Sequence, residues 1–292
     1  MAAPLISRRT APACFVAGGI AMYAGAAIAY NLFDDVPPQS VAWLRCCGAA
    51  LVLAAVARPW RRRGVWTPAM LRVAAAFGIA TALMNTSFYL AIDRIPLGTA
   101  VAIEFAGPVA VAALSMRSRR SLAGLGAATI GVLVLSGVQL SGDALGVLFA
   151  LGAAACWAAY IVLGARVSRS ATASGVDGLT IGLMVGSLVL VPVGVWGSAP
   201  AFTSPRILAL CVAVGVLSTA VPYALDQLVL RVVDTSTFAL LLALLPVAAT
   251  AMGWIALHQH LEPAELVGVG CVVLGLALNG LATEPAEPAL SA

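Results

Sequence analysis

The sequence is divided into ten long apolar stretches of similar length, joined by short connections. These stretches cover residues 12–32, 40–57, 70–91, 97–116, 122–140, 145–164, 178–198, 206–230, 236–256 and 264–282. Each is close to the ~20 apolar residues that a helix needs to cross a bilayer. Lipid offers no partner for backbone polar groups, and the stretches lack the alternation typical of barrel strands. We therefore predict an all-α integral membrane protein with ten transmembrane helices.

The composition excludes most other classes of protein. Charged residues make up only 10% of the chain, whereas about 25% is usual in soluble domains. The apolar stretches leave no room for a soluble catalytic or nucleic-acid-binding domain, so the net charge of +4 is not a nucleic-acid signal. The GxSxG, HExxH, GxGD and nucleotide-loop patterns are absent from the sequence. We expect no enzyme activity, no cofactor and no nucleic-acid partner.

The six cysteines all fall inside apolar stretches and lack the spacing of metal ligands, so we interpret them as packing residues: Cys14, Cys46, Cys47, Cys156, Cys211 and Cys271. The segment His258-Gln259-His260, followed by Glu262 and Glu265, is weak evidence for a metal site. We interpret it as a solvated loop and expect no metal.

The arginines predict the orientation in the membrane. Most lie on one side of a ten-crossing path: Arg8, Arg9, Arg58, Arg61, Arg62, Arg63, Arg72, Arg117, Arg119, Arg120, Arg166, Arg169 and Arg231. Only Arg94 and Arg206 lie on the other side. Since arginine is enriched in cytoplasmic connections, both termini are predicted to be cytoplasmic.

The first stretch has an alternative interpretation as a cleaved signal peptide. Arg8 and Arg9 precede it, and Ala27-Ile28-Ala29 is similar to a signal-peptidase site. The stretch is longer than a usual signal core, and its removal would place the termini on opposite faces, against the arginine distribution. We therefore interpret it as a retained helix.

A weak internal repeat divides the helices into two sets of five. Residues 78–94 align without gaps on residues 215–231, and Pro108 in the fourth stretch is matched by Pro246 in the ninth. Because five is odd, the halves would be inverted in the membrane, as in many secondary transporters. We predict one repeat at 12–140, a second at 145–282, and short cytoplasmic tails at 1–11 and 283–292.

Glu104 is the first of three ionisable residues inside the apolar stretches. It lies about seven residues into its helix, ~10 Å below the surface. Pro108 lacks the N–H that would bond the carbonyl of Glu104, so we expect a bend there. Such a carboxyl group suits an ammonium group or a proton. The alternative is a protonated acid that bonds a neighbouring helix.

Arg45 and Asp226 are the other two ionisable residues. Arg45 lies near the outer end of its helix, so it either extends to the headgroups or turns inward as a carboxylate contact or partner of Glu104. Asp226 lies near the cytoplasmic end of its helix, five residues before Arg231. An ion pair between these two residues and a role in transport are its alternatives.

Aromatic and amide residues at mid-helix positions are candidates for a cavity wall: Tyr23, Asn85, Tyr89, Trp157, Tyr160 and Tyr223. Pro222 would free the carbonyl of Ser218, so three helices carry proline interruptions, at Pro108, Pro222 and Pro246. Interrupted helices in corresponding positions of two halves are typical of a transport site. Small-residue spacings at Gly124-Ala128 and Gly268-Val272-Gly275 would permit a homodimer.

Four segments carry a resemblance to a known family. Residues 96–108, PLGTAVAIEFAGP, resemble the helix-4 signature of the drug/metabolite transporter superfamily, EamA type, in its threonine/homoserine exporter branch. Residues 155–161 (ACWAAYI), 217–225 (LSTAVPYAL) and 58–61 (RPWR) are similar to the same branch. The resemblance implies ten helices in two inverted halves that export small amino acids or related metabolites. It makes Glu104 the helix-4 glutamate and Trp157 the helix-6 tryptophan.

Two departures from the branch affect the expected site. The branch often has Glu-Pro in helix 9, where this chain has Leu245-Pro246, and Gly-Glu before helix 10, where this chain has His258-Gln259. Without the helix-9 carboxylate, Glu104 is expected to carry the acidic role alone.

Together these observations predict a secondary active transporter in the bacterial inner membrane, working by alternating access. Its partners would be a small-molecule substrate and the lipid bilayer, and either a proton gradient or a solute gradient would drive export. Glu104 would take the ammonium group or proton, and Arg45 the substrate carboxylate. The alternatives are a multidrug or lipid-intermediate carrier of the same fold, and a receptor or assembly subunit that transports nothing.

Overall fold

The structure is a computed structural model, which describes residues 10–61, 66–95, 97–116, 118–135, 143–170, 174–245, 247–248 and 263–282. Within these residues all regular structure is helical. The longer helices are α1 (Ala11–Leu32), α2 (Pro38–Ala57), α3 (Pro68–Ile92), α6 (Arg119–Leu135), α7 (Ala144–Ser168), α8 (Gly175–Val189) and α15 (Pro263–Ala282). The shorter pieces are η1 (Pro59–Arg61), α4 (Leu97–Glu104), α5 (Ala106–Ser115), α9 (Val191–Gly194), α10 (Ala199–Thr203), α11 (Pro205–Gly215), η2 (Val216–Ala220), α12 (Val221–Leu230) and α13 (Thr235–Leu241).

Several helices begin where the sequence supplies a cap. Thr67 accepts a hydrogen bond from the backbone N–H of Met70, directly before Pro68 at the start of α3. At the start of α8, Ser174 and Asp177 form a reciprocal capping box. These side chains satisfy backbone donors that have no partner inside the helix. They fix the helix starts within a few residues of the predicted apolar stretches.

Two of the three predicted proline interruptions lie in helices that the structure describes. The 97–116 stretch forms α4 and α5, which break at Phe105, three residues before Pro108. The 206–230 stretch forms α11 and α12, joined by the π-helical turn η2, which ends directly before Val221 and Pro222. Because a proline has no N–H for the carbonyl four residues before it, both breaks lie where the sequence predicts them.

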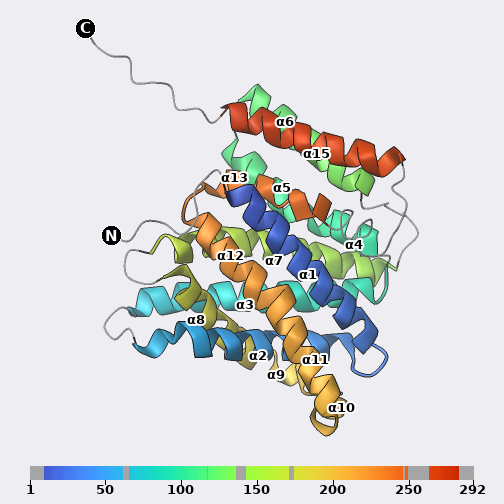
Figure 1. Ribbon diagram of the computed structural model, residues 1–292, viewed down its shortest axis with the longest axis vertical. Helices are drawn as coiled ribbons and strands as arrows, with labels where there is room; N and C mark the ends of the chain where they lie inside the picture. Colours follow the sequence, from blue (N-terminus) through green and yellow to red (C-terminus); the bar gives the residue numbers. More distant parts are fainter. Residues whose placement is uncertain are drawn as a thin grey trace.

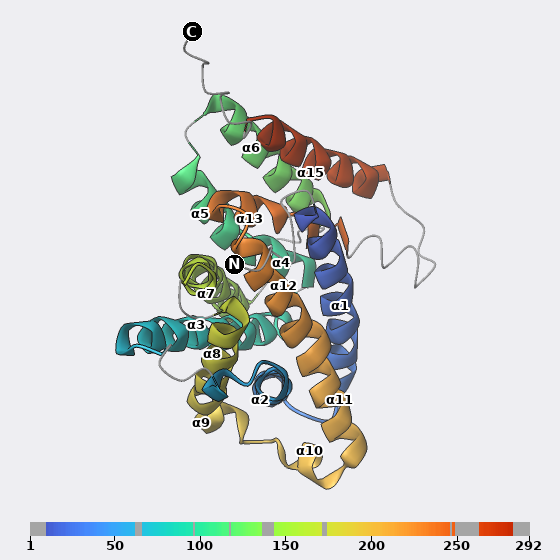
Figure 2. The same cartoon turned by 60° about the vertical axis from the view of Figure 1, so that its left-hand side comes forward.

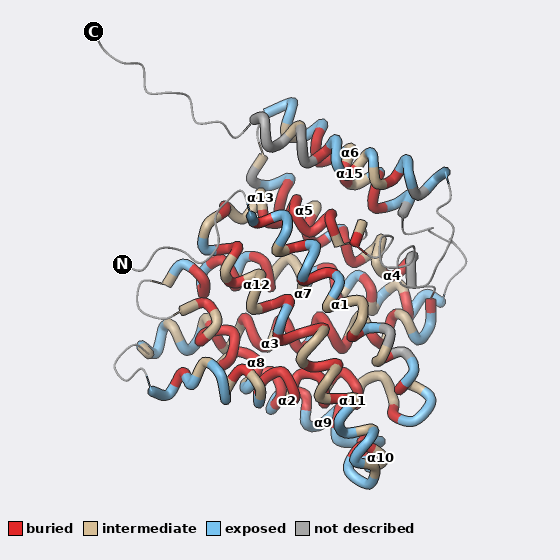
Figure 3. The backbone as a smooth tube through the Cα atoms, viewed as in Figure 1, coloured by how far each residue is buried: buried red, intermediate tan, exposed pale blue. Residues whose placement is uncertain are grey.

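The helices form a central group and a peripheral pair. Helices α2, α3, α7, α8, α11 and α12 pack side by side, and α1 lies along α11 and α12 (Figure 1; Figure 2). Helices α6 and α15 pack along each other at one edge (Figure 1). Buried residues are concentrated in the central group, whereas much of the α6 and α15 surface is exposed (Figure 3).

Close backbone contacts at glycines join helices of the N-terminal half of the chain to helices of the C-terminal half. A Cβ atom added to Gly78 in α3 would overlap the backbone of Gly182 in α8. A Cβ atom added to Gly215 in α11 would lie 2.6 Å from the backbone oxygen of Arg45 in α2. Glycine is therefore required at both crossings for the helices to approach this closely.

The outer surface is rich in exposed apolar side chains. Leu114 is 85% exposed, Val56 74% and Leu188 72%. Four helical segments are long and apolar enough to cross a membrane: Pro38–Arg61, Pro68–Ile92, Ala144–Ser168 and Pro205–Leu230. Shorter apolar helices accompany them at Ala11–Ala26, Thr99–Leu114, Gly175–Val189 and Leu266–Gly275. Such a surface suits the hydrocarbon core of a bilayer and not water.

The predicted interface for a homodimer is occupied within the chain. A Cβ atom on Gly275 would lie 2.5 Å from the backbone oxygen of Gly124 and 2.8 Å from the backbone nitrogen of Ala128. A Cβ atom on Gly131 would lie 2.6 Å from the oxygen of Gly268. These small residues pack α6 against α15, so they do not face a second copy.

Candidate functional site

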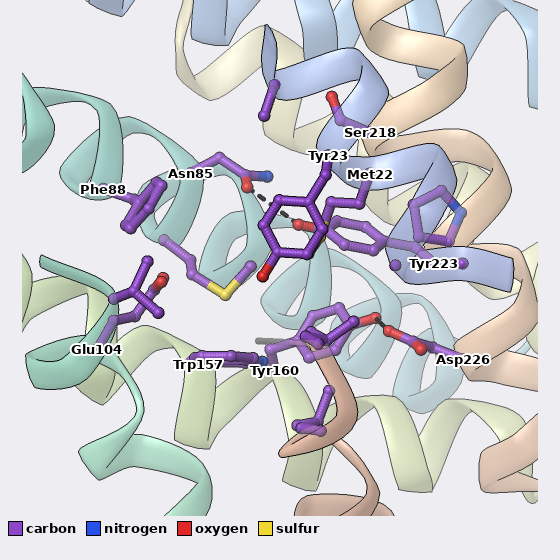
Figure 4. Close-up of a pocket in the computed structure, with 18 of the residues that line it drawn as sticks. Met22, Tyr23, Asn85, Phe88, Glu104, Trp157, Tyr160, Ser218, Tyr223 and Asp226 are labelled. Carbon is purple, nitrogen blue, oxygen red and sulfur yellow. Dashed lines mark hydrogen bonds between the residues drawn. The ribbon is translucent and has the colours of Figure 1, made fainter. Parts of the chain in front are cut away.

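A cavity of about 160 Å³ lies between α1, α2, α3, α4, α7 and α12. Its lining includes all the residues that the sequence predicts for substrate or proton binding: Tyr23, Arg45, Asn85, Tyr89, Glu104, Trp157, Tyr160, Tyr223 and Asp226. Figure 4 shows Glu104 at one side of the cavity and Asp226 at the other, with Tyr23 and Trp157 between them. Of the predicted helix bends, Pro222 also lines the cavity.

Glu104 faces the cavity from the last residue of α4. It is 9% exposed and forms neither a hydrogen bond nor an ion pair with the described residues. Among the described residues, the alternative of a protonated acid that bonds a neighbouring helix is therefore wrong. The expected pairing with Arg45 is also absent, because the guanidinium is bonded elsewhere.

Arg45 is only 6% exposed and turns inward, so its expected extension to the headgroups is wrong. Its Nη1 donates to the Tyr89 hydroxyl at 2.9 Å, and its Nε donates to the Thr219 hydroxyl. Its Nη2 donates to the Ser218 carbonyl at 2.7 Å and to the Tyr223 hydroxyl at 3.4 Å. The Ser218 carbonyl is the one that Pro222 leaves without a helical donor, so Arg45 satisfies the break in η2.

Tyr223 extends this network to α3. Its hydroxyl donates to the Asn85 side-chain oxygen at 3.0 Å (Figure 4). The same hydroxyl accepts a hydrogen bond from Arg45. The contacts of Arg45, Tyr223, Asn85 and Tyr89 therefore tie α2, α3 and α12 together on one side of the cavity. A buried network of this kind fixes the positions of its members.

Asp226 accepts a hydrogen bond of 2.7 Å from the Tyr160 hydroxyl of α7 (Figure 4). Its expected ion pair with Arg231 is wrong, because Arg231 is exposed at the end of α12 and no such contact joins the two described residues. The cavity therefore contains two carboxyl groups. The acidic role expected of Glu104 stays a prediction, and Asp226 is a second carboxyl group in the same cavity.

The rest of the wall is mostly apolar and aromatic. Tyr160 packs against Tyr223 with ring centroids 5.2 Å apart, and Phe105 against Trp157 at 6.3 Å. Leu245 lines the cavity as well. The residue at which the chain departs from the Glu-Pro expected of the exporter branch is therefore apolar and lies at the cavity itself.

Sequence reasoning did not identify the apolar lining of α1. It follows a four-residue spacing that marks one helix face: Cys14, Gly18, Met22 and Ala26, beside Phe15, Gly19 and Tyr23. Phe88 and Met84 of α3 were missed as well. Met84 directly precedes Asn85 in the sequence, and Phe88 directly precedes Tyr89. This proximity to two predicted cavity residues is the signal that could have identified them.

Some predicted features lie outside the described residues. These are Pro246, the loop residues His258, Gln259, His260 and Glu262, and the tails except residues 10 and 11. Among the described residues, no cluster of His, Cys, Asp and Glu could hold a metal ion.

Comparison with known proteins identifies relatives over most of the chain. Residues 144–281 match the EamA-like transporter family. The chain is 36% identical to the threonine/homoserine exporter RhtA of Escherichia coli (strain K12), over 85% of this chain and 84% of that protein. It is 34% identical to the exporter of the same name from Salmonella typhimurium (strain SL1344), over 90% and 88%.

A solved crystal structure shares the fold, with a TM-score of 0.70 at 20% identity, over 94% of this chain and 98% of that chain. The apolar helices, the cavity between them and the exporter relatives together identify the chain as a multi-pass membrane protein. It belongs to the EamA-like transporter family of the drug/metabolite transporter superfamily, in the branch of the threonine/homoserine exporter RhtA.

Proposed function

We propose that the chain is a secondary active transporter that exports a small amino acid or related metabolite across the bacterial inner membrane by alternating access. The carboxyl group of Glu104 carries this proposal. It faces a small cavity between helices and has no partner among the described residues. An ionisable group inside a membrane is costly and usually marks a binding site.

The chemistry of the cavity supports an amino acid as substrate. Glu104 would bind the ammonium group or a proton, and Arg45 would provide positive charge for a carboxylate. The aromatic rings of Tyr23, Trp157 and Tyr160 would contact the remainder of the molecule. The relatives named threonine/homoserine exporter support the same class of substrate.

The cavity size favours a small solute over a drug or a lipid intermediate. Its volume is about 160 Å³, whereas sites for drug-sized ligands usually have ~300–1,000 Å³. A multidrug carrier would need a wider cavity than this conformation has.

Asp226 supports coupling to a proton. It provides a second carboxyl group in a cavity where Leu245 replaces the helix-9 carboxylate. Export would then exchange a substrate ammonium group at Glu104 for a proton, with Asp226 as the second protonation site.

Helix packing supports ten crossings arranged as two inverted halves, 12–140 and 145–282. In such an arrangement α3 corresponds to α11 and α12, and α8 corresponds to α2. The close crossing of α3 with α8 at Gly78 then corresponds to that of α11 with α2 at Gly215. The neighbours α6 and α15 would be the equivalent last helices of the two halves.

The ends of the helices support the predicted orientation. Helices α2 and α7 end, and α3 begins, at the left of Figure 1. Arg58, Arg72, Arg166 and Arg169 belong to these ends. An arginine-rich side is cytoplasmic by the positive-inside rule, so both termini would be cytoplasmic.

Counterflow in liposomes tests the proposal. The purified chain is reconstituted into vesicles loaded with unlabelled threonine, and uptake of labelled threonine is followed with homoserine or a bulky cationic dye as competitor. We expect uptake that homoserine inhibits and the dye does not. Inhibition by the dye alone would favour a multidrug carrier. Uptake equal to that of empty vesicles, for every labelled metabolite tested, would favour a receptor or assembly subunit.

A further inference from the structure

A second cavity lies between α5, α7 and α13 and has a volume of about 510 Å³. These three helices lie next to one another, and Figure 2 shows α7 almost end-on beneath α5 and α13. The lining consists of Val111, Leu114, Val162, Ala165, Arg166, Arg169 and Thr235. None of these residues lines the cavity that contains Glu104.

We call this second cavity the groove. Two arginines at the end of α7 form its polar side: Arg166 in the last turn and Arg169 at the C-cap. Arg169 donates from Nη2 to the Val233 carbonyl at 2.9 Å, which fixes its side chain at the groove. Arg166 is exposed and forms neither a hydrogen bond nor an ion pair with the described residues. Its guanidinium is therefore available to an anion.

The other wall is apolar and partly exposed. Leu114 is 85% exposed and Val162 is 40% exposed, and Val111 and Ala165 complete the wall. A ligand of this groove would need both an apolar chain and an anionic group. A phospholipid with a negatively charged headgroup has this combination.

One acidic residue lies near the groove and does not cancel its charge. Burial would raise the pKa of Asp234, but the Ser236 and Thr237 hydroxyls and the Thr237 backbone N–H hydrogen-bond its carboxylate and hold that pKa below its usual value. The carboxylate is thus ionised and bonded within its own helix start. Two arginines against one aspartate leave a net positive charge.

We propose that this groove binds one anionic phospholipid of the cytoplasmic leaflet. Its phosphate would lie between Arg166 and Arg169, and an acyl chain would lie along Leu114 and Val162. Basic pockets between helices at the cytoplasmic side favour such headgroups, because a guanidinium pairs well with phosphate in a partly desolvated site.

Lipid titration with native mass spectrometry and thermal unfolding tests this site. The purified full chain in detergent is titrated with phosphatidylglycerol, phosphatidylcholine or inorganic phosphate. The variants are R166Q, the double variant R166Q/R169Q and the control R58Q/R61Q, which removes two exposed arginines at the end of α2. R166Q breaks no hydrogen bond to the described residues, so its folding is expected to be unchanged.

We expect one phosphatidylglycerol to bind and raise the melting temperature, with weaker binding by about fivefold in R166Q and about thirtyfold in the double variant. The control should bind as the parent chain does. Equal binding of phosphatidylcholine, equal stabilisation by inorganic phosphate, or the same loss in R58Q/R61Q would overturn the proposal.

Discussion

The guanidinium of Arg45 joins parts of the chain that are far apart in sequence. It bonds Tyr89 of α3 and, 173 residues away, the Ser218 carbonyl. That carbonyl has no helical donor because Pro222 lacks an N–H. Arg45 therefore stabilises the break in η2, and most of its donors are used within the protein. A substrate carboxylate would meet a guanidinium that is already held in position.

Substitution of Arg45 by lysine should lower stability although it keeps the charge. An ammonium group cannot make the same forked set of bonds, so one or more buried acceptors would lose their partner. We expect R45K to lower the free energy of unfolding by about 1–3 kcal/mol. Thermal unfolding in detergent measures this change. R166K is the matched control and should unfold at the parent temperature. Equal melting temperatures of R45K and the parent would refute the role of Arg45 in stabilising η2.

The ionisable, tyrosine and tryptophan residues of the cavity could be predicted from residue type and depth, since such groups are rare inside apolar helices. The hydrogen-bond partners of these residues could not be predicted. The distance of Arg45 from the start of its helix leaves open which way the side chain turns, and the spacing of Asp226 from Arg231 suits an ion pair that does not form. The partner of Asp226, Tyr160, is 66 residues away in sequence.

At the scale of the helix, the interruption in η2 brings Ser218, Pro222 and Tyr223 to the cavity. A continuous α-helix would direct the Ser218 carbonyl along the helix axis toward residue 222. The π-helical turn leaves it available to Arg45. Pro222 therefore determines the shape of the cavity through the backbone.

Replacing Pro222 by alanine should separate stability from transport. Alanine supplies an N–H that can bond the Ser218 carbonyl, so we expect P222A to melt at or above the parent temperature. Export should fall by about tenfold or more, because Arg45 loses its carbonyl partner to the helix. P205A, at the first turn of α11, should change neither quantity. A P222A variant with parental export would contradict this view of η2.

The crossing of α3 with α8 makes a second prediction at this scale. A Cβ atom on Gly78 would overlap the backbone of Gly182, whereas a Cβ atom on Gly126 in α6 would have nothing within 4 Å. We expect G78A to lower the free energy of unfolding by about 1–3 kcal/mol, and G126A to leave it unchanged or raise it by about 0.5–1 kcal/mol. Thermal unfolding of both variants measures these changes. Equal effects of G78A and G126A would contradict the close contact between α3 and α8 at Gly78.

Helix positions could be predicted from hydropathy because lipid requires each crossing to satisfy its own backbone. The apolar stretches agree with α1, α2, α3, α6, α7 and α15 within a few residues. The division of the 178–198 stretch into α8 and α9 lies directly before Pro192, a sequence signal that the prediction did not use. The π-helical form of η2 could not be predicted. It accompanies packing with α2, as in the hydrogen bond from Arg45 to the Ser218 carbonyl.

At the scale of the whole molecule, charge and polarity predict the orientation in the membrane. Arginines gather where α2 and α7 end, while the surface between the helix ends is apolar. The cavity with Glu104 lies in the interior between these helices. The proposed alternating access would need this arrangement, because the binding site would have to be open to each side in turn.

Cysteine labelling tests the orientation. We expect a membrane-impermeant maleimide to label T203C, at the end of α10, in intact cells. S118C, at the connection between α5 and α6, should be labelled only after the membrane is permeabilised. The parent chain, with its six free cysteines, gives the background. The reverse pattern of labelling would show that the arginine-rich side is not cytoplasmic.

The most direct measurement of the central claim is export by the Glu104→Gln variant. Threonine and homoserine efflux is compared in dipeptide-loaded bacteria that lack their own exporters, at equal membrane levels of parent, E104Q, D93N and empty vector. D93N is the control, since Asp93 is an exposed carboxylate at the end of α3. We predict export by the parent and D93N, and a loss of about 10-fold to 100-fold in E104Q, as expected for a bond to a charged group. Export by E104Q at the parental rate would contradict the assignment of Glu104 as the substrate or proton site.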